Sequence, residues 1–355
     1  MVDIKGYISW FTPPLDQTMG YGIAAVETIR GIQHGGVKVD WNDTTPYVHI
    51  NFIQPEMYEG HDKQYRIGYT PWESTVIDDS WVRIMKTQNE MWTPSHFCKD
   101  VFESYGIENV KVVPHGINPE LYPIVDRERG DKFVFLHIGG PVERKGGQKV
   151  ASAFVDVFGD KDDAFLVMKS HGPSEARWYD RKIYRGNIRN HERVKVIDET
   201  ISQADIFKLY EMANCMVYPT NGEGFGLIPF QAIATGLPTI TTNLTATADF
   251  ADLSMPLNAT WGPGFGLHTG DWAIPDEDHL RELMLDAYEN WQDHKKKAMQ
   301  SAKIIHSTQT WNHVGAQIID ILGYEKMNMT TGVEFYEGGG YTNWVASIHG
   351  GGRND

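Results

Sequence analysis

Residues 218–232 read YPTNGEGFGLIPFQA, and this stretch decides how the second half of the chain is interpreted. A short apolar strand is predicted to end at Tyr218, and a helix is predicted to begin near Phe225. Three glycines in the stretch allow the backbone to approach a ligand closely, and the first N–H groups of a helix bind anions readily. The loop therefore suits a diphosphate whose attached sugar lies beside Glu223. A tight strand-to-helix turn without a ligand is the simpler interpretation of the glycines alone.

Short β-branched runs alternate with longer amphipathic segments on both sides of this stretch, which is typical of parallel sheets covered by helices. In the first part of the chain we predict strands at Ile4–Trp10, Val48–Phe52, Arg66–Tyr69, Met91–Thr93 and Lys111–Val113, and helices at Tyr21–His34, Trp81–Gln88 and Ser95–Tyr105. In the second part we predict strands at Phe133–Ile138, Phe165–Met168, Val194–Ile197, Cys215–Tyr218 and Pro238–Thr241, and helices at Gly146–Phe158, Ser202–Met212, Phe225–Thr235, after Asp276, and at Lys295–His306 and Trp311–Leu322.

A proline-rich stretch, residues 114–123, interrupts the alternation and leads into the charged run 126–131. Because 355 residues are too many for one ordinary core, we interpret this stretch as a linker between two α/β domains. Both domains are expected to be Rossmann-like and to face each other across a cleft at the carboxyl ends of their strands. The expected boundaries are 1–122 for the N-terminal domain, 123–305 for the C-terminal domain, 306–324 for a helix that packs back on the N-terminal domain, and 325–355 for a glycine-rich tail.

The composition is that of an ordinary globular protein with an excess of acidic residues. Lysine and arginine number 32 and aspartate and glutamate 47, so the net charge is −15. This charge argues against broad attraction to nucleic acid or to an anionic membrane. Neither a signal peptide nor an apolar run of about 18 residues is recognisable, so we expect a cytoplasmic protein with no integral membrane segment. Cys98 and Cys215 are expected to be buried and reduced.

A second candidate segment follows the predicted strand Phe133–Ile138. The chain continues through Gly139 and Gly140 to the basic pair Arg144 and Lys145. Such a pair in a loop usually lies in solvent, but at the end of a strand in the second domain it can reach a ligand in the cleft. There it would offset the negative charge that builds up on a departing phosphate.

Residues 218–232 resemble the Glu-x(7)-Glu region of retaining glycosyltransferases of the glycogen-synthase and mannosyltransferase type, a glycosyltransferase family 4-like group with the GT-B fold. Glu223 matches the first glutamate of that motif, and Gln231 occupies the position of the second. Other segments resemble the same family in the same order, over roughly residues 5–320. They are the loop 12–22, the segment 92–118, the strand and loop 135–146, and residues 234–240.

The resemblance implies a role for each matched residue. Glu223 would contact the donor sugar, and Gln231 would bind the ribose hydroxyls. Arg144 and Lys145 would bind the diphosphate. Gly140 stands where the family often has an arginine, so one phosphate contact is expected to be lost or supplied elsewhere. The other residues expected at the donor are Gly20, Gly139, Gly224, Phe225, Gly226 and Leu227.

The resemblance also implies a reaction. A sugar would pass from a nucleotide-diphosphate donor to an acceptor hydroxyl with retention of configuration, and the departing phosphate would take the proton of the acceptor. The nucleotide could be UDP, GDP or ADP. No cofactor and no metal are expected, and the residues themselves show no His/Cys cluster with zinc spacing.

The acceptor side is less defined. Trp72 and Glu73 follow the predicted strand Arg66–Tyr69 and are candidates for contacts with the acceptor, although a core tryptophan and a surface carboxylate fit equally well. Lys169 can reach the cleft, although an exposed loop is the simpler interpretation. A glycan, a protein or a modified DNA base would serve as acceptor.

Three alternatives to this function stay open. One is a non-catalytic nucleotide-sugar-binding protein, which the departures at Gly140 and Gln231 motivate. Another is an enzyme that glycosylates hydroxymethylated bases in DNA. The third is a sugar-nucleotide epimerase, because a fold does not determine a function.

Overall fold

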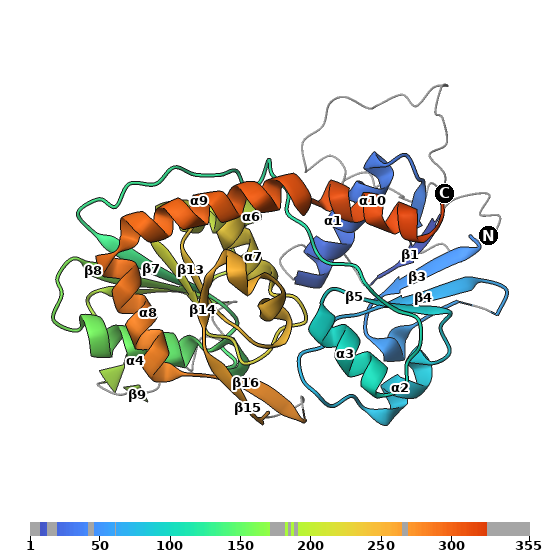
Figure 1. The fold of residues 1–355 in the computed structure, drawn as a ribbon, viewed down its shortest axis with the longest axis horizontal. Helices are drawn as coiled ribbons and strands as arrows, with labels where there is room; N and C mark the ends of the chain where they lie inside the picture. Colours follow the sequence, from blue (N-terminus) through green and yellow to red (C-terminus); the bar gives the residue numbers. More distant parts are fainter. Residues whose placement is uncertain are drawn as a thin grey trace, which may run out of the picture.

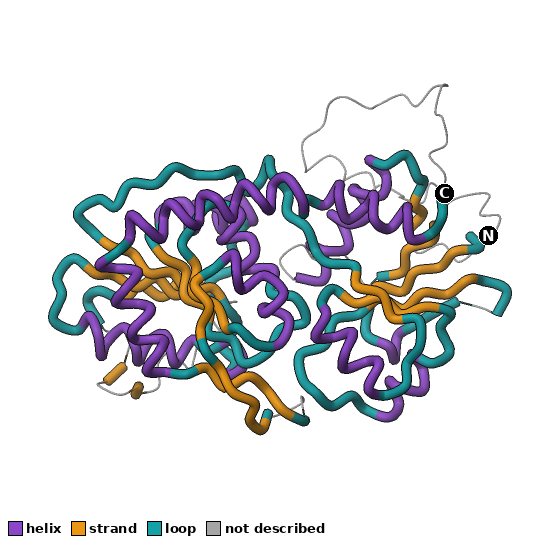
Figure 2. Tube along the Cα trace, in the orientation of Figure 1, coloured by secondary structure: helices purple, strands orange, loops and turns teal. Residues whose placement is uncertain are grey.

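The structure is a computed structural model that describes residues 8–12, 20–41, 46–60, 62–170, 182–183, 186–187, 191–264 and 269–324. Two α/β domains lie side by side, and each is built around a six-stranded sheet (Figure 1). Every strand pairing within these two sheets is parallel, and helices lie on both sides of each sheet (Figure 2). The predicted α/β class with two Rossmann-like domains is therefore confirmed. The predicted tail, residues 325–355, lies outside the described residues.

The first sheet has the order β2-β1-β3-β4-β5-β6. Its strands are β1 (Ile8–Phe11), β2 (Val39–Trp41), β3 (Val48–Phe52), β4 (Tyr65–Tyr69), β5 (Glu90–Thr93) and β6 (Val110–Val112). The connecting helices are α1 (Gly20–His34), η1 (Pro55–Met57), α2 (Asp79–Met85) and α3 (His96–Ser104). β3 is buried along its whole length, as expected for a central strand of a sheet that is covered on both faces.

The second sheet has the order β11-β8-β7-β12-β13-β14. Its strands are β7 (Phe133–Ile138), β8 (Ala164–Lys169), β11 (Val194–Ile197), β12 (Cys215–Tyr218), β13 (Thr239–Thr242) and β14 (Met255–Leu257). The helices of this domain are η2 (Glu143–Lys145), α4 (Gly147–Phe158), α6 (Gln203–Met212), α7 (Leu227–Ala234), η5 (Thr245–Leu253), α8 (Glu277–Glu289) and α9 (Trp291–Thr308). The strand order reverses between β7 and β12, and ligands of doubly wound sheets bind at the carboxyl ends of the strands beside such a reversal.

Helix α10 (Trp311–Ile321) follows α9 but packs against α1 of the first domain (Figure 1). A Cβ atom on Gly31 would lie 2.0 Å from the carbonyl oxygen of Trp311, so the absence of a side chain lets the two helices meet at their backbones. The chain thus crosses between the domains twice, and Ile117 and Thr310 form a parallel bridge where the two crossings lie side by side.

A short antiparallel hairpin joins the domains at another place. It consists of β15 (Ala259–Pro263) and β16 (Asp271–Pro275), which belong to the second half of the chain. The N–H of Asp271 donates to Thr75 Oγ1 of the first domain at 2.8 Å. The ring of Trp261 stacks on that of Phe97 in α3, with centroids 6.0 Å apart. The hairpin therefore fastens the loop after β4 to the second domain.

Several sequence-based predictions are confirmed in detail. Ser95, Ser202 and Asp276 cap α3, α6 and α8 through their side chains, and Cys98 and Cys215 are buried free thiols. The predicted start of a helix near Phe225 is wrong by two residues. Gly226 adopts the left-handed conformation with φ of 93°, so α7 begins only at Leu227. Strands β2, β9 (Lys182–Ile183), β10 (Gly186–Asn187), β14, β15 and β16 were not predicted.

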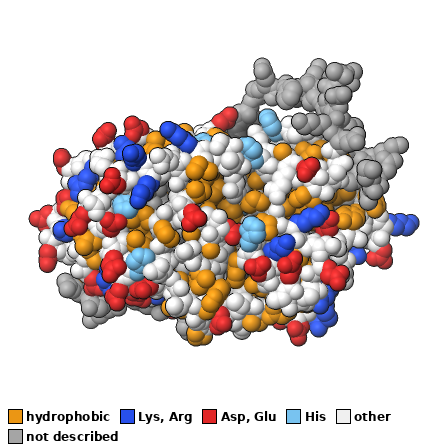
Figure 3. Space-filling view, in the orientation of Figure 1, with side chains coloured by type: hydrophobic (Ala, Val, Ile, Leu, Met, Phe, Trp, Pro, Cys, Tyr) orange, Lys and Arg blue, Asp and Glu red, His pale blue; other side chains and the backbone are white. Residues whose placement is uncertain are grey.

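Within the described residues, none of the helices has the length and the apolar character that crossing a bilayer requires. On the face shown in Figure 3, acidic and basic side chains are intermixed over both domains.

Candidate active site

A cavity of about 210 Å³ lies at the carboxyl ends of the second sheet, where helix α1 of the first domain faces them. The first domain contributes Gly20 and Ile23 to its wall. The second domain contributes the ends of β7, β8 and β12, the loop before α6, and the start of α7. The residues from the second domain are Ile138, Gly139, Gly140, Lys145, Lys169, Ser170, Thr200, Ile201, Gln203, Ile206, Tyr218, Glu223, Leu227 and Ile228.

Glu223 is the carboxylate of this cavity, and it is almost completely enclosed, with 7 % of its surface exposed. One oxygen, Oε1, accepts a hydrogen bond from Lys145 Nζ at 2.6 Å and another from the hydroxyl of Tyr218 at 2.9 Å. Thr220 Oγ1 lies 3.1 Å from the same oxygen. These contacts hold Glu223 in one orientation beside the glycine loop, and they leave its second carboxylate oxygen as the atom that can face a ligand.

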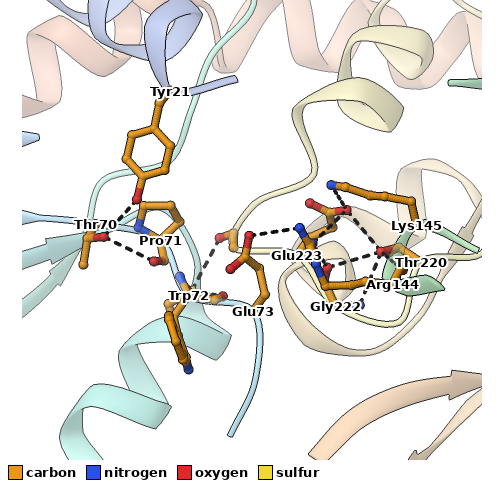
Figure 4. A network of polar contacts seen from close by, with 12 residues as sticks. Tyr21, Thr70, Pro71, Trp72, Glu73, Arg144, Lys145, Thr220, Gly222 and Glu223 are labelled. Atoms are coloured by element: carbon orange, nitrogen blue, oxygen red, sulfur yellow. Dashed lines mark hydrogen bonds and ion pairs between the residues drawn. The ribbon is translucent and has the colours of Figure 1, made fainter. Parts of the chain in front are cut away.

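Arg144 connects this cluster to the first domain. Its guanidinium lies 3.6 Å from Glu223 Oε1 and 3.3 Å from Glu73 Oε1, and it also donates to the carbonyl of Gly222 (Figure 4). Two carboxylates from different domains therefore share one arginine. Together with Lys145 they form a group of two positive and two negative side chains at one end of the cavity.

Burial and charge act against each other in this cluster. Burial alone would raise the pKa of Glu223, but Lys145 and Arg144 hold it below the ordinary glutamate value. Burial lowers the pKa of Lys145, and the adjacent charge of Arg144 lowers it further. Burial also disfavours the charge of Arg144, yet the carboxylates of Glu73 and Glu223 keep its pKa above the ordinary value. The lowered pKa of Glu223 makes this carboxylate a weak base.

Two glycines let the domains touch beside Glu223. A Cβ atom on Gly222 would lie 2.3 Å from the carbonyl oxygen of Glu73, and one on Gly224 would lie 2.2 Å from Cβ of Pro71. No side chain fits in either gap without moving the first domain. Gly222 and Gly224 thus permit a close approach between domains, in addition to any approach to a ligand.

The start of α7 provides anion-binding groups. Among the described residues no side chain caps this helix, and Leu227 and Ile228 at its first turn both line the cavity. Because the first N–H groups of a helix lack intrahelical acceptors, they are available to a phosphate. The ring of Phe225, which was predicted at the donor, is instead buried against Phe230 and His115.

The other predicted site residues separate into two groups. Gly20, Gly139, Lys145, Glu223 and Leu227 line the cavity, as does Gly140. Gln231, Gly224, Gly226, Arg144 and Trp72 lie outside its wall. Their assignment to ligand contacts stays a prediction.

Gln231 and Trp72 are engaged in the protein interior. The side-chain oxygen of Gln231, which is 2 % exposed, lies 3.3 Å from the hydroxyl of the buried Tyr210. The indole of Trp72 packs edge-on against Trp81 and donates to the carbonyl of Val76 at 3.0 Å. The interpretation of Trp72 as a core residue, left open by the sequence, matches this position.

The sequence did not indicate the residues that orient Glu223. Tyr218 and Thr220 were recognised only as a strand end and a loop, because their contacts depend on how the loop folds back. Lys169 is 4 % exposed and lines the cavity, so the interpretation of this residue as part of an exposed loop is wrong. Its place at the carboxyl end of a strand was the signal that could have identified it.

Comparison with known proteins agrees with this architecture. The sequence profile of the family Glycosyl transferases group 1 matches residues 132–256. A curated protein of Sulfolobus islandicus filamentous virus (isolate Iceland/Hveragerdi), assigned the name glycosyltransferase 45, is 20% identical over 233 residues. That match covers 62% of this chain, and the chain spans 62% of the length of the viral protein.

Solved structures of glycosyltransferases share the fold. Sucrose-phosphate synthase of Thermosynechococcus elongatus superimposes with a TM-score of 0.69 at 13% identity, over 90% of this chain and 98% of that one. HepE of Anabaena, solved in complex with UDP-glucose, gives a TM-score of 0.68 at 13% identity, over 90% of this chain and all of that one.

The predicted resemblance is thus confirmed on two levels. The arrangement of the two parallel sheets is that of GT-B proteins. The family match identifies residues 132–256, which carry Lys145 and Glu223, as a glycosyltransferase domain, so the prediction of a transferase is confirmed for this domain. The chain has the GT-B fold, and its residues 132–256 match the family Glycosyl transferases group 1.

Proposed function

We propose that this chain transfers a sugar from a nucleoside-diphosphate donor to an acceptor hydroxyl, with retention of configuration at the anomeric carbon. One observation carries the proposal. The buried carboxylate of Glu223 is held by Lys145 at 2.6 Å, in the wall of a cavity that lies where the sheet order reverses. This arrangement combines a fixed acceptor for sugar hydroxyls with a cation for the departing phosphate.

The donor diphosphate would lie between Lys145 and the first turn of α7. Lys145, Leu227 and Ile228 all line the cavity, and the N–H groups of Leu227 and Ile228 belong to the first turn of α7. Both kinds of donor stabilise the charge that develops on the phosphate as the glycosidic bond breaks. Since protein groups meet this charge, we propose that the reaction needs no metal ion.

The state of Glu223 supports retention. Its pKa is lowered and two donors occupy one of its oxygens, so it is poorly suited to take a proton from water or from an acceptor. In a retaining transfer, the acceptor attacks from the face that the phosphate leaves, and a phosphate oxygen takes the acceptor proton. A strong protein base is then unnecessary, and Glu223 acts by orienting the donor sugar.

The acceptor would approach from the first domain. There, the hydroxyls of Tyr21 and Thr70 lie 3.0 Å apart, next to the loop that carries Glu73 (Figure 4). We propose that Glu73 helps to orient the acceptor hydroxyl. Since both cysteines of the chain are unpaired, we place the reaction in a reducing compartment such as the cytoplasm.

The test is a transfer and hydrolysis assay with UDP-, GDP- and ADP-linked sugars, beginning with UDP-glucose because HepE was solved with it. We expect one nucleotide class to be consumed, and NMR of the product should show the anomeric configuration of the donor. Glu223→Ala and Lys145→Ala should abolish turnover while the fold is kept. Binding of a nucleotide sugar without transfer or hydrolysis would favour a non-catalytic binding protein, and near-normal turnover in both variants would refute the site.

A further inference from the structure

The strand order of the second sheet gives the cavity two ends. Tyr218 and Glu223 lie over the end of β12, and Gly139 and Lys145 lie over β7. Lys169 ends β8, the next strand along, where it pairs with Ile138 on one side and with Ile197 of β11 on the other. Three strand spacings separate β12 from β11, which amounts to roughly 14 Å. If the proposed function holds, a sugar over β12 and a diphosphate over β7 place the nucleoside over β8 and β11.

Two polar side chains, those of Lys169 and Ser170, lie at the end of the cavity where the nucleoside would bind. Lys169 lies in the wall of the cavity and its ammonium donates to the carbonyl of Ser170. A lysine ammonium has three N–H donors, so two more can serve a ligand. The charges that act on Lys169 come from Glu199 and Asp198 in the loop after β11, and burial lowers its pKa despite them. Lys169 therefore belongs to the end of the cavity that is remote from Glu223.

Ser170 provides an independent indication of a ligand. The residue is 2 % exposed and lines the same cavity, and its Oγ has no hydrogen-bond partner among the residues that the structure describes. An unpaired hydroxyl is costly inside a protein unless a ligand or a water completes it. Thr200 and Gln203 also line this cavity.

We propose that Lys169 and Ser170 select the nucleobase of the donor, and that they favour a base with a carbonyl oxygen where adenine and cytosine carry an amino group. Uracil, thymine and guanine have that carbonyl. The ammonium can only donate, so it pairs with a carbonyl oxygen but opposes an exocyclic amine. The proposal rests on the proposed function, and it narrows the donor to keto-base nucleotides.

The experiment measures dissociation constants of UDP, GDP, ADP and free pyrophosphate by calorimetry, for the wild type, Lys169→Met and Ser170→Ala. Lys195→Met is the matched control, because Lys195 lies on the adjacent strand β11 and is exposed. Thermal unfolding of each variant checks that the fold is kept. The wild type should bind UDP or GDP at least tenfold more tightly than ADP.

We expect Lys169→Met to raise the dissociation constant of the preferred keto-base nucleotide by about tenfold or more, and a tenfold change corresponds to ~1.4 kcal/mol. ADP and pyrophosphate should bind to Lys169→Met as tightly as they bind to the wild type. Ser170→Ala should lose less affinity for the keto-base nucleotide and should also keep its affinity for ADP and pyrophosphate. An equal loss for all three nucleotides and pyrophosphate would show that Lys169 binds phosphate, and unchanged binding would show that it binds nothing; either result overturns the inference. A wild type that binds none of the nucleotides would instead refute the proposed function.

Discussion

Replacing Glu223 by glutamine should separate donor binding from turnover. The substitution keeps the size of the side chain and an oxygen that Tyr218 and Thr220 can bond, but it removes the charge. In the wild type, Arg144 and Lys145 are balanced by Glu73 and Glu223. Glu223→Gln leaves this cluster with a net charge of about +1.

The expected magnitudes follow from the burial of the pair. Breaking a buried ion pair by removing one partner costs about 3–5 kcal/mol, and the isosteric amide should bring the loss of stability to the lower end of that range. A positive charge about 5 Å from a phosphate is worth ~3 kcal/mol at an effective dielectric constant of about 20, and solvent reduces this value. We therefore expect UDP to bind about tenfold more tightly. Turnover should fall by about 100-fold, because a hydrogen bond from the donor sugar to a charged group is lost.

The assay combines calorimetric titration of UDP with the rate of sugar transfer and a thermal unfolding curve. Glu289→Gln serves as the control, because it makes the same change at an exposed position of α8. A parallel fall of UDP affinity and turnover in Glu223→Gln would contradict the reasoning. It would mean that Glu223 maintains the shape of the donor site and does not bond to the donor sugar.

Three further predictions concern the interface, pH and metal ions. Gly224→Ala should hold the domains apart, since its Cβ would meet Pro71 at 2.2 Å, so turnover should drop more than tenfold while small-angle scattering shows a larger radius of gyration. Burial lowers the pKa of His115 to about 3, so the folded state binds its proton only below that value, whereas the unfolded chain binds it near the ordinary value of 6.5. The contribution of neutral His115 to the free energy of unfolding is thus complete above pH 6.5. As the pH falls from 6.5 towards 3, this contribution declines by up to ~1.4 kcal/mol per pH unit. Chemical denaturation of His115→Phe should show a shallower decline of stability over the same pH range. EDTA should leave transfer unchanged, and a loss that Mg²⁺ restores would contradict the proposed metal-free reaction.

The sequence predicted the buried strands well. Val48–Phe52, Phe133–Ile138 and Cys215–Tyr218 have the predicted bounds, because a short apolar run between turns has few alternatives in a parallel sheet. The edge strand Val194–Ile197, in which Lys195 is exposed, also has its predicted bounds. The hairpin of β15 and β16 was not predicted from the sequence. Some of its stabilising contacts come from Thr75 and Phe97, which lie in the other domain, and others come from two hydrogen bonds between Asn221 and Ala273.

Only part of the site was predicted, because some of its contacts also form between the two domains. The sequence selected Glu223 and Lys145 only with the help of the family resemblance, because the glycines and the predicted helix start alone indicated no more than an anion site. It gave no indication that Arg144 would lie between Glu223 and Glu73, because that contact depends on how two domains close. The engagement of Gln231 with Tyr210 likewise depends on the packing of α7 against α6.

The return of α10 to the first domain has a consequence for the order of folding. Trp311, Val314 and Ile318 belong to the same buried cluster as Trp10 and Ile32, although about 300 residues of chain separate them. During synthesis, the first domain emerges from the ribosome long before the helix that completes its core. Its apolar surface on α1 must therefore stay uncovered until the second domain has been translated. A chain truncated before residue 311 should bind chaperones and aggregate, even though every strand of both sheets is present in it.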